Sequence, residues 1–472
     1  MTRHRNREGL EFTAANAQAV EGYDEAVKRY LQFHQDIGGA LKAALTQDPQ
    51  MPMALCLRGY FYMLMGMRPL VDKARQLAEG LQAQREACTA REQRHIDALA
   101  SWSRDSLRAA TRYWEDIACD HPRDILAVKM AHFGYFYLGR SAAIRDGIAQ
   151  AIDFWSPRDA LYSYMLSMMS FGQVEAGDLQ QAEAYGRRAL ELTPQDPWGV
   201  HAVAHSLETT ERRFEAFDWI EQHEPNWSQA NNFRYHIHWH RALIHLERGD
   251  LQAALDWYDR TVFAAGSVEY LDVCNEASLL LRLELNGVPL GDRWQAVAQK
   301  AGERVNDQAM GCADVHYMMA LSSSPLPEHA AQAQTLMDNL VRYSESGTDN
   351  AEAYRVAVVP LARALLAFRQ GRYAESARDV LNCADQAHAA GGSHDQRDVY
   401  EYLAAEALFR ADPAAPRTIA YLARRSFVAP YNRHNWQRYL QALIQAGHEP
   451  TLNEAQARCR VALDGDLPEI GS

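Results

Sequence analysis

The sequence predicts an all-α fold in which helix pairs stack one on another into a superhelix, an α-solenoid. Almost every segment of the 472 residues repeats its apolar side chains with a helical period, and the alternation typical of β-strands is missing. Glycine and proline fall between the periodic segments rather than inside them. A helical bundle without internal repetition is the alternative architecture.

Repetition favours the stacked array. Similar segments begin at residues 177, 211 and 249, and the small residue of each falls at Ala182, Ala216 and Ala254. The first two alanines are 34 residues apart, the tetratricopeptide period, and the next spacing is 38, which requires a longer first helix or loop. We therefore expect residues 1–22 to be an N-terminal extension and residues 23–472 to form one continuous array of divergent tetratricopeptide-like helix pairs. If such an array curls strongly, it approaches closure.

Composition excludes several classes of protein. The net charge of −13 and the lack of a basic run disfavour a nucleic-acid surface. No run of 18 apolar residues is present, so we expect no membrane span. The seven cysteines are scattered without a CxxC motif, and the N-terminus lacks the apolar segment of a signal peptide. These features predict a cytoplasmic protein with reduced thiols.

Two histidine pairs stand out in neighbouring repeats. His201 and His205 are four residues apart, as are His236 and His240, and this spacing puts both rings of a pair on one helix face. Glu208 lies on the same stripe as the first pair. First helices of successive repeats line the concave surface of such arrays, so the two pairs are expected to converge there. A glutamate beside them can fix a tautomer or raise the pKa of an imidazole.

The second segment carries two further histidines on the other face of its helix. His238 and His245 fall among Arg234, Arg241 and Arg248, so we expect both to face solvent.

Three interpretations of the inner histidines stay open. They form a hydrogen-bonded structural network, a ligand or catalytic pocket without metal, or a site for a divalent metal. The zinc-protease motif HExxH is absent. The candidate metal ligands are His201, His205, His236 and His240.

Other segments offer weaker candidates. Asp314 and His316 interrupt an apolar helix over residues 309–321, and their angular separation allows at most one of them to face a shared pocket. Asp272 and Glu276 share a face that is typical of a solvated stripe, with acid–base work as the alternative.

A predicted helix start near residue 393 offers an anion site. Ser393 and Gln396 form an S-x-x-Q capping box, which leaves His394, Arg397 and Asp398 unexplained. A helix N-terminus beside an arginine attracts anions. A well-capped surface helix is the alternative. GxGxxG, P-loop and GxSxG motifs are absent, which removes the usual support for nucleotide binding and serine-hydrolase chemistry.

Five stretches of the chain occur in a characteristic order: HAVAHSLE, HIHWHRALIHLERGDLQAALDWYD, ASLLLRLELNGVPLGDRW, DVHYMMAL and GGSHDQRDVY. From about Asp24 to about Tyr439 the chain resembles the tetratricopeptide repeat protein 38 family. The resemblance implies a superhelix of divergent helix pairs but no firm reaction. This chain departs from the family pattern in one place. In the family the second histidine segment more often reads HNWWH, and here His238 stands at the position of its first tryptophan. The positions that are characteristic of the family correspond in this chain to His201, His205, Glu208, His236, His240, Asp314, His316, His394, Gln396, Arg397 and Asp398.

These observations favour a pocket in the concave groove that binds a small polar or anionic molecule and transforms it by hydrolysis or addition–elimination. The four inner histidines would act as base, acid or metal ligands, with Glu208, Asp314 and His316 as further catalytic candidates. An interaction scaffold for a peptide, with a purely structural histidine network, is the alternative, and a homodimer is a further option. The expected substrate-binding residues are His394, Gln396, Arg397, Asp398 and Trp239.

Overall fold

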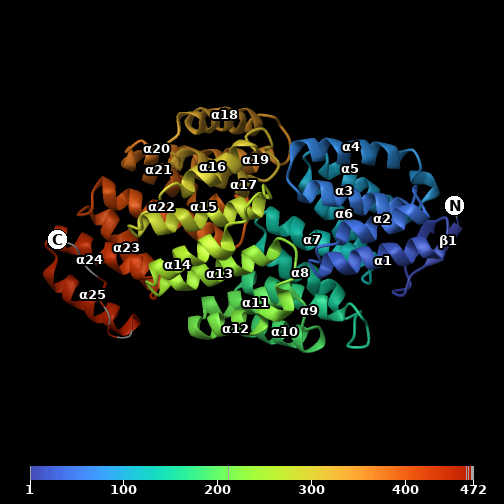
Figure 1. The fold of residues 1–472 in the computed structure, drawn as a ribbon, viewed down its shortest axis with the longest axis horizontal. Coiled ribbons are helices and arrows are strands. Elements are labelled where there is room, and N and C mark those ends of the chain that lie inside the picture. The colour runs from blue at the N-terminus through green and yellow to red at the C-terminus, as the bar shows by residue number, and fades with distance from the viewer. Residues whose placement is uncertain (1, 211, 464, 466, 469–472) are drawn as a thin grey trace.

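The computed structural model describes residues 2–210, 212–463, 465 and 467–468, and it shows a helical-repeat fold (Figure 1). The first half of the chain contains α1 (Ala17–Leu31), α2 (Ile37–Gln47), α3 (Pro52–Leu64), α4 (Arg68–Gln82), α5 (Ala90–Trp102), α6 (Leu107–Asp120), α7 (Ile125–Tyr137), α8 (Ser141–Ile152), α9 (Tyr162–Ala176), α10 (Leu179–Leu192), α11 (Pro197–Thr209) and α12 (Arg213–Trp227).

The second half continues the same pattern. Short 3-10 helices lie at Arg85–Ala87 in the first half and at Ala384–Ala390 in the second, and short π-helices lie at Tyr258–Val262 and Tyr354–Val358. The helices are α13 (Phe233–Glu247), α14 (Leu251–Trp257), α15 (Tyr270–Leu285), α16 (Arg293–Gly302), α17 (Gly311–Ser323), α18 (Pro327–Ser344), α19 (Ala351–Ala353), α20 (Val359–Arg369), α21 (Tyr373–Cys383), α22 (His394–Ala411), α23 (Pro416–Val428), α24 (Arg433–Gln445) and α25 (Glu449–Ala462).

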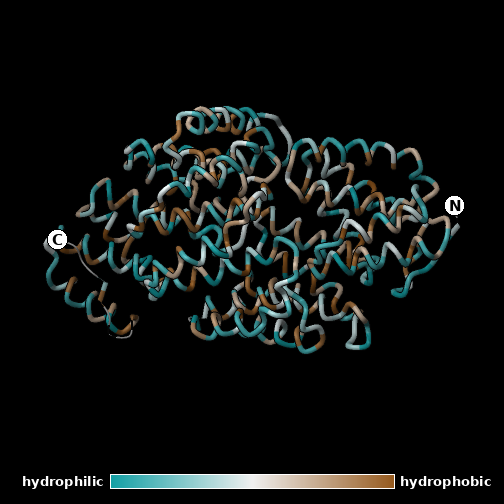
Figure 2. The backbone as a smooth tube through the Cα atoms, viewed as in Figure 1, coloured by the Kyte–Doolittle hydropathy of each residue, from teal (hydrophilic) through white to brown (hydrophobic). Residues whose placement is uncertain are grey.

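Helix pairing confirms the predicted solenoid. Consecutive helices pack as pairs, such as α9 with α10 and α11 with α12, and the first helices α9, α11, α13, α15 and α17 pack on one another in series. Ala182, Ala216 and Ala254 are fully buried, as expected where two helices approach closely. Apolar and polar residues alternate along the helices (Figure 2), so each pair hides its apolar face against its neighbours.

The superhelix curls until distant repeats touch at several places, including the following two. At the first, the Arg68 side chain donates to the backbone carbonyls of Asp307 and Gln308 at 2.9 and 2.8 Å. At the second, Gly139 has φ +65° and packs against the His388 carbonyl, so closely that a Cβ would lie 1.9 Å from that oxygen. The segment that leads into α22 is thereby held against α7, and α22 also packs on α15.

The chain begins with a short β-hairpin that the sequence did not indicate. Strands β1 (Thr2–Arg5) and β2 (Glu11–Ala14) pair antiparallel, and Gly9 with φ +81° forms their turn. The first helix starts at Ala17, earlier than the boundary at residue 23 that we expected.

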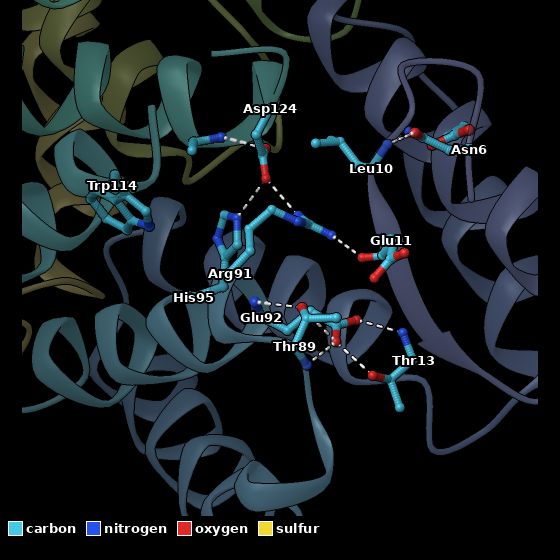
Figure 3. Close-up of polar contacts among 12 residues, drawn as sticks. Asn6, Leu10, Glu11, Thr13, Thr89, Arg91, Glu92, His95, Trp114 and Asp124 are labelled. Carbon is cyan, nitrogen blue, oxygen red and sulfur yellow. Dashed lines mark hydrogen bonds and ion pairs between the residues drawn. The ribbon is translucent and has the colours of Figure 1, made fainter. Parts of the chain in front are cut away.

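Buried polar groups attach this hairpin to the first repeats (Figure 3). The carboxylate of Glu92, fully buried in α5, accepts hydrogen bonds from the Thr13 N–H at 2.8 Å and the Thr13 hydroxyl at 2.6 Å. Arg91 donates to the Glu11 carbonyl at 3.0 Å and to the Asp124 carboxylate at 2.5 Å. The hairpin is therefore part of the folded body rather than a loose extension.

Two large apolar clusters fill the array and meet in α13. Phe233, Ile237 and Ile244 belong to the cluster of the first half, and Trp239 and Leu243 to that of the second half. The second histidine pair therefore lies at the junction of the two cores. Among the helices described, none combines the length and the apolar character needed to cross a bilayer.

Candidate functional site

The two histidine pairs converge as predicted. Asp196 caps α11 and Pro197 occupies its first turn, which fixes the start of the helix that carries His201 and His205. Helix α13 packs on α11 (Figure 1), and the rings of His236 and His240 on α13 contact those of His201 and His205 on α11. One ring nitrogen from each of the four lies within 4.8 Å of those of the others. We call these four residues the histidine cluster.

The rings of the histidine cluster are in direct contact and shielded from solvent. His201 Nε2 lies 2.9 Å from His205 Nε2 and 3.1 Å from His236 Nε2. The ring centroids of His205 and His240 are 4.3 Å apart. All four side chains are buried, the most exposed being His236 at 4%.

The outer nitrogens of three rings face oxygen atoms. His205 Nδ1 forms an ion pair with Asp395 Oδ2 at 2.6 Å, and His236 Nδ1 lies 2.9 Å from Asn275 Oδ1. His240 Nδ1 lies 3.2 Å from Glu208 Oε2, so the glutamate lies beside an imidazole of the cluster, as the sequence predicted. An oxygen acceptor at Nδ1 keeps a proton there and turns Nε2 toward the centre of the cluster.

Sequence reasoning missed two of these oxygens. Asp395 lies between residues that were singled out, but the fold alone brings α22 to α11 across about 190 residues of chain. Asn275 is one of several buried polar residues of α15, next to Glu276, and the sequence offered no signal that singled it out.

The charges of the cluster are unevenly distributed. Burial alone would lower the pKa of His205, but the charge of Asp395 outweighs burial and raises it. Burial opposes ionisation of Asp395 too, yet the neighbouring imidazole holds its pKa below the usual range. In the other three rings, burial first and the neighbouring imidazoles second lower the pKa. His205 is therefore the ring of the cluster that binds a proton most readily.

Glu208 has the opposite character to Asp395. Burial raises the pKa of Glu208 well above its usual range, and the charge of Asp395 raises it further. The pKa values of two carboxyl groups beside one imidazole cluster are thus shifted in opposite directions, which is a common arrangement for an acid and its partner in active sites.

The histidine cluster contributes to the walls of two cavities. The first, the apolar cavity, has a volume of about 320 Å³ and an aromatic lining that includes Phe171, Trp198 and Phe233, with His201 and His236 in its wall. The second, the polar cavity, has a volume of about 730 Å³ and includes His205 and Glu208 in its wall. Both volumes are in the range of small-ligand sites.

The polar cavity contains most of the predicted anion-binding residues. His394 lies 3.1 Å from the buried carboxylate of Glu175, which is also 3.9 Å from Arg397. Asp398 pairs with Arg425 at 2.7 Å. All five residues line the polar cavity.

Arg425 has unused hydrogen-bonding capacity. Its side chain is 5% exposed, and its Nε and Nη2 atoms have no hydrogen-bond partner among the residues described. A buried guanidinium with unpartnered N–H groups suits an anion. The predicted capping box of Ser393 and Gln396 is present, but Gln396 lines the apolar cavity instead.

Three predicted site residues lie elsewhere. Trp239 is fully buried, donates to Ser278 Oγ at 3.1 Å and stacks on His236, so it supports the cluster and lines neither cavity. Asp314 accepts a hydrogen bond from Tyr354 at 2.5 Å, and His316 contacts Cys312. Neither of them lines the apolar or the polar cavity, although Gly311 and Cys312 at the start of α17 line the apolar cavity.

Two expectations of solvent exposure were wrong. His238 is 9% exposed and packs between Trp227 and Trp257, because α12 and α14 cover this face of α13. His245 packs against Trp257 as well. Asp272 and Glu276 of α15, which we expected to face solvent, are buried too. Glu276 pairs with Lys300 at 2.7 Å, and Asp272 accepts hydrogen bonds from Asn232 and Ser267.

No model of a known protein family matches this chain. Among solved structures, one titled "Structure of Naa15/Naa10 bound to HypK-THB" aligns over 93% of the chain, with 12% sequence identity and a TM-score of 0.27. The chain spans 62% of the length of the chain it matches there.

Proposed function

We propose that this helical-repeat protein binds a small anionic molecule in the polar cavity and transforms it by hydrolysis or addition–elimination. One observation carries the proposal. A buried arginine with unpartnered N–H groups, Arg425, shares a cavity with an imidazole–carboxylate pair, His205 and Asp395, and with the buried acid Glu208. A purely structural network needs no cavity of this size beside it.

The chemistry follows from the two carboxyl groups. Asp395 orients His205 through Nδ1, and the raised pKa of His205 makes Nε2 of its neutral form a stronger base toward a water molecule that replaces His201 as the partner of this nitrogen. Glu208, whose pKa burial raises well above its usual range, donates a proton to the leaving group. The two protons balance: the base gains one from water and the leaving group gains one from the acid.

Anion binding is tested by isothermal titration of the full chain with inorganic phosphate and with phenyl phosphate. We expect saturable binding that Arg425→Met weakens by about tenfold or more, because a charge-assisted hydrogen bond contributes about 1.5–3 kcal/mol. Arg417→Met is the control, since Arg417 is an exposed residue of the same helix, α23. Equal affinities in all three proteins would refute the site.

Catalysis is tested with phenyl acetate and phenyl phosphate, because their phenolate leaving group is basic enough to need a proton from the acid. Glu208→Gln is expected to lower kcat by about 100-fold or more, the usual contribution of a general acid. Glu221→Gln is the control, because Glu221 lies on the outer helix α12 and pairs with Arg241. If wild type and Glu208→Gln turn over both esters equally slowly, the protein only binds, and the scaffold alternative gains support.

Two further proposals concern the whole chain. The same histidine segments that meet in the site carry the proposed membership of the tetratricopeptide repeat protein 38 family. Each of the seven cysteines is a free thiol, which supports a cytoplasmic location.

A further inference from the structure

We infer that the histidine cluster is a binding site for one divalent first-row transition metal ion, such as Zn²⁺. The ligands are the Nε2 atoms of His201, His205, His236 and His240. This inference rests on the arrangement of the ring nitrogens and does not depend on the proposed function.

The separations of these nitrogens fit a tetrahedral ion. Zinc–nitrogen bonds of about 2.0–2.1 Å in a tetrahedron place ligand nitrogens about 3.3 Å apart. Two of the observed separations, His201 to His205 and His201 to His236, are 2.9 and 3.1 Å. One nitrogen of each of the four rings lies within 4.8 Å of the others, so shifts of less than about 1.5 Å complete the tetrahedron.

Hydrogen bonds among the four rings cannot give every Nε2 atom of the histidine cluster a partner. With the Nδ1 proton of His236 directed at Asn275, its Nε2 lone pair points at His201 Nε2. A proton shared by His205 Nε2 and His201 Nε2 makes one hydrogen bond between these two rings and none to the other two. His240 Nε2 is buried without a partner among the residues described, and this is unfavourable whether or not it carries a proton. A cation at the centre converts these contacts into bonds.

The groups around the cluster are those that support metal-binding histidines. A histidine ligand normally donates its other N–H to a carboxylate or amide oxygen, which fixes the ring and increases its basicity. Asp395, Asn275 and Glu208 occupy these positions for three of the rings. Four imidazoles without a direct carboxylate ligand favour zinc, copper, nickel or iron over magnesium and calcium.

The polar cavity gives the ion a route to the cluster. His205 and Glu208 belong both to the site and to the cavity wall, so an ion in the polar cavity lies at the edge of the histidine cluster. A bound ion would change the role of His205 from base to ligand and leave Glu208 as the acid.

The experiment uses the full chain after treatment with a chelator. Zn²⁺ is titrated in competition with a chromogenic chelator, and Co²⁺ is used to read the coordination geometry from its visible absorption. We expect one tightly bound Zn²⁺ per cluster and the intense absorption of tetrahedral Co²⁺. His240→Gln should weaken binding at this site by about 100-fold or more, since it removes one of four ligands.

The matched control is His238→Gln. His238 is a buried histidine of the same helix, two residues away and outside the cluster, so this variant should bind metal like wild type. Circular dichroism checks the fold of both variants. If His240→Gln fails to fold, Asp395→Asn decides instead. That variant keeps all four ligands but loses the charged oxygen at His205, so it should bind about 10–100-fold more weakly.

Several results would overturn the inference. They are the absence of stoichiometric binding by wild type, an affinity unchanged in both His240→Gln and Asp395→Asn, or an equal loss in His238→Gln. Zinc retained by His240→Gln but lost by Cys312→Ser would place the ion at a different candidate group, Cys274, Cys312 and His316. Phosphate binding that fails while zinc binding holds would refute only the proposed function.

Discussion

Replacing Asp314 with asparagine tests the electrostatics of the core and predicts a pH-dependent gain in stability. Asp314 is 1% exposed, and its carboxyl group accepts a hydrogen bond from Tyr354 at 2.5 Å. Burial raises the pKa of Asp314 from about 3.8 to about 7. The folded protein therefore binds a proton between these values that the unfolded chain releases, so the contribution to stability is complete below pH 4 and is lost as the pH rises through 7.

The magnitude follows from the same two pKa values. A difference of about three pH units corresponds to about 4 kcal/mol in full, of which roughly 2–3 kcal/mol is lost between pH 5 and pH 8. Because asparagine has no charge to bury, the stability of Asp314→Asn relative to wild type should rise by about that amount over this interval. Urea unfolding followed by circular dichroism measures it.

A control residue separates this effect from general acid–base changes. Asp338 is exposed on α18, and Asp338→Asn should keep a constant difference from wild type at both pH values. If the difference between Asp314→Asn and wild type is also constant, Asp314 is ionised in the folded state, and the argument from burial is refuted.

Three further changes test the closure, the hairpin and the core. Gly139→Ala should destabilise the fold by about 1–3 kcal/mol more than Gly177→Ala, since both glycines have positive φ but only Gly139 lies against a backbone carbonyl; equal unfolding midpoints would contradict this. Thr13→Val should lower the unfolding free energy by about 1–3 kcal/mol because it removes a donor from the buried Glu92 carboxylate, whereas Thr13→Ser should not. Burial lowers the pKa of Lys129 to about 7, so the cost of its charge is full below pH 7 and declines up to about pH 10. The stabilisation by Lys129→Met in thermal unfolding should therefore be larger at about pH 6 than at about pH 9, and the opposite trend would be evidence against a buried charge.

The sequence predicted the histidine pairs of the cluster but not all of the residues that contact them. The spacing of His201 with His205 and of His236 with His240 was enough to predict that the pairs face each other, because helix geometry fixes which side chains share a face. The partner Asp395 was not predictable, because it arrives from a helix pair far along the chain.

The sequence by itself determined the helical repeats, the start of α22 at its capping box and the convergence of the two histidine pairs. These depend on interactions within a few turns of helix or between adjacent repeats. The tertiary structure decided the burial of His238 and of Asp272, the exclusion of Asp314 from the cavities and the approach of α22 to α11. The physical reason is that periodicity defines the faces of a helix, whereas only the helices packed around it decide which of those faces meets solvent.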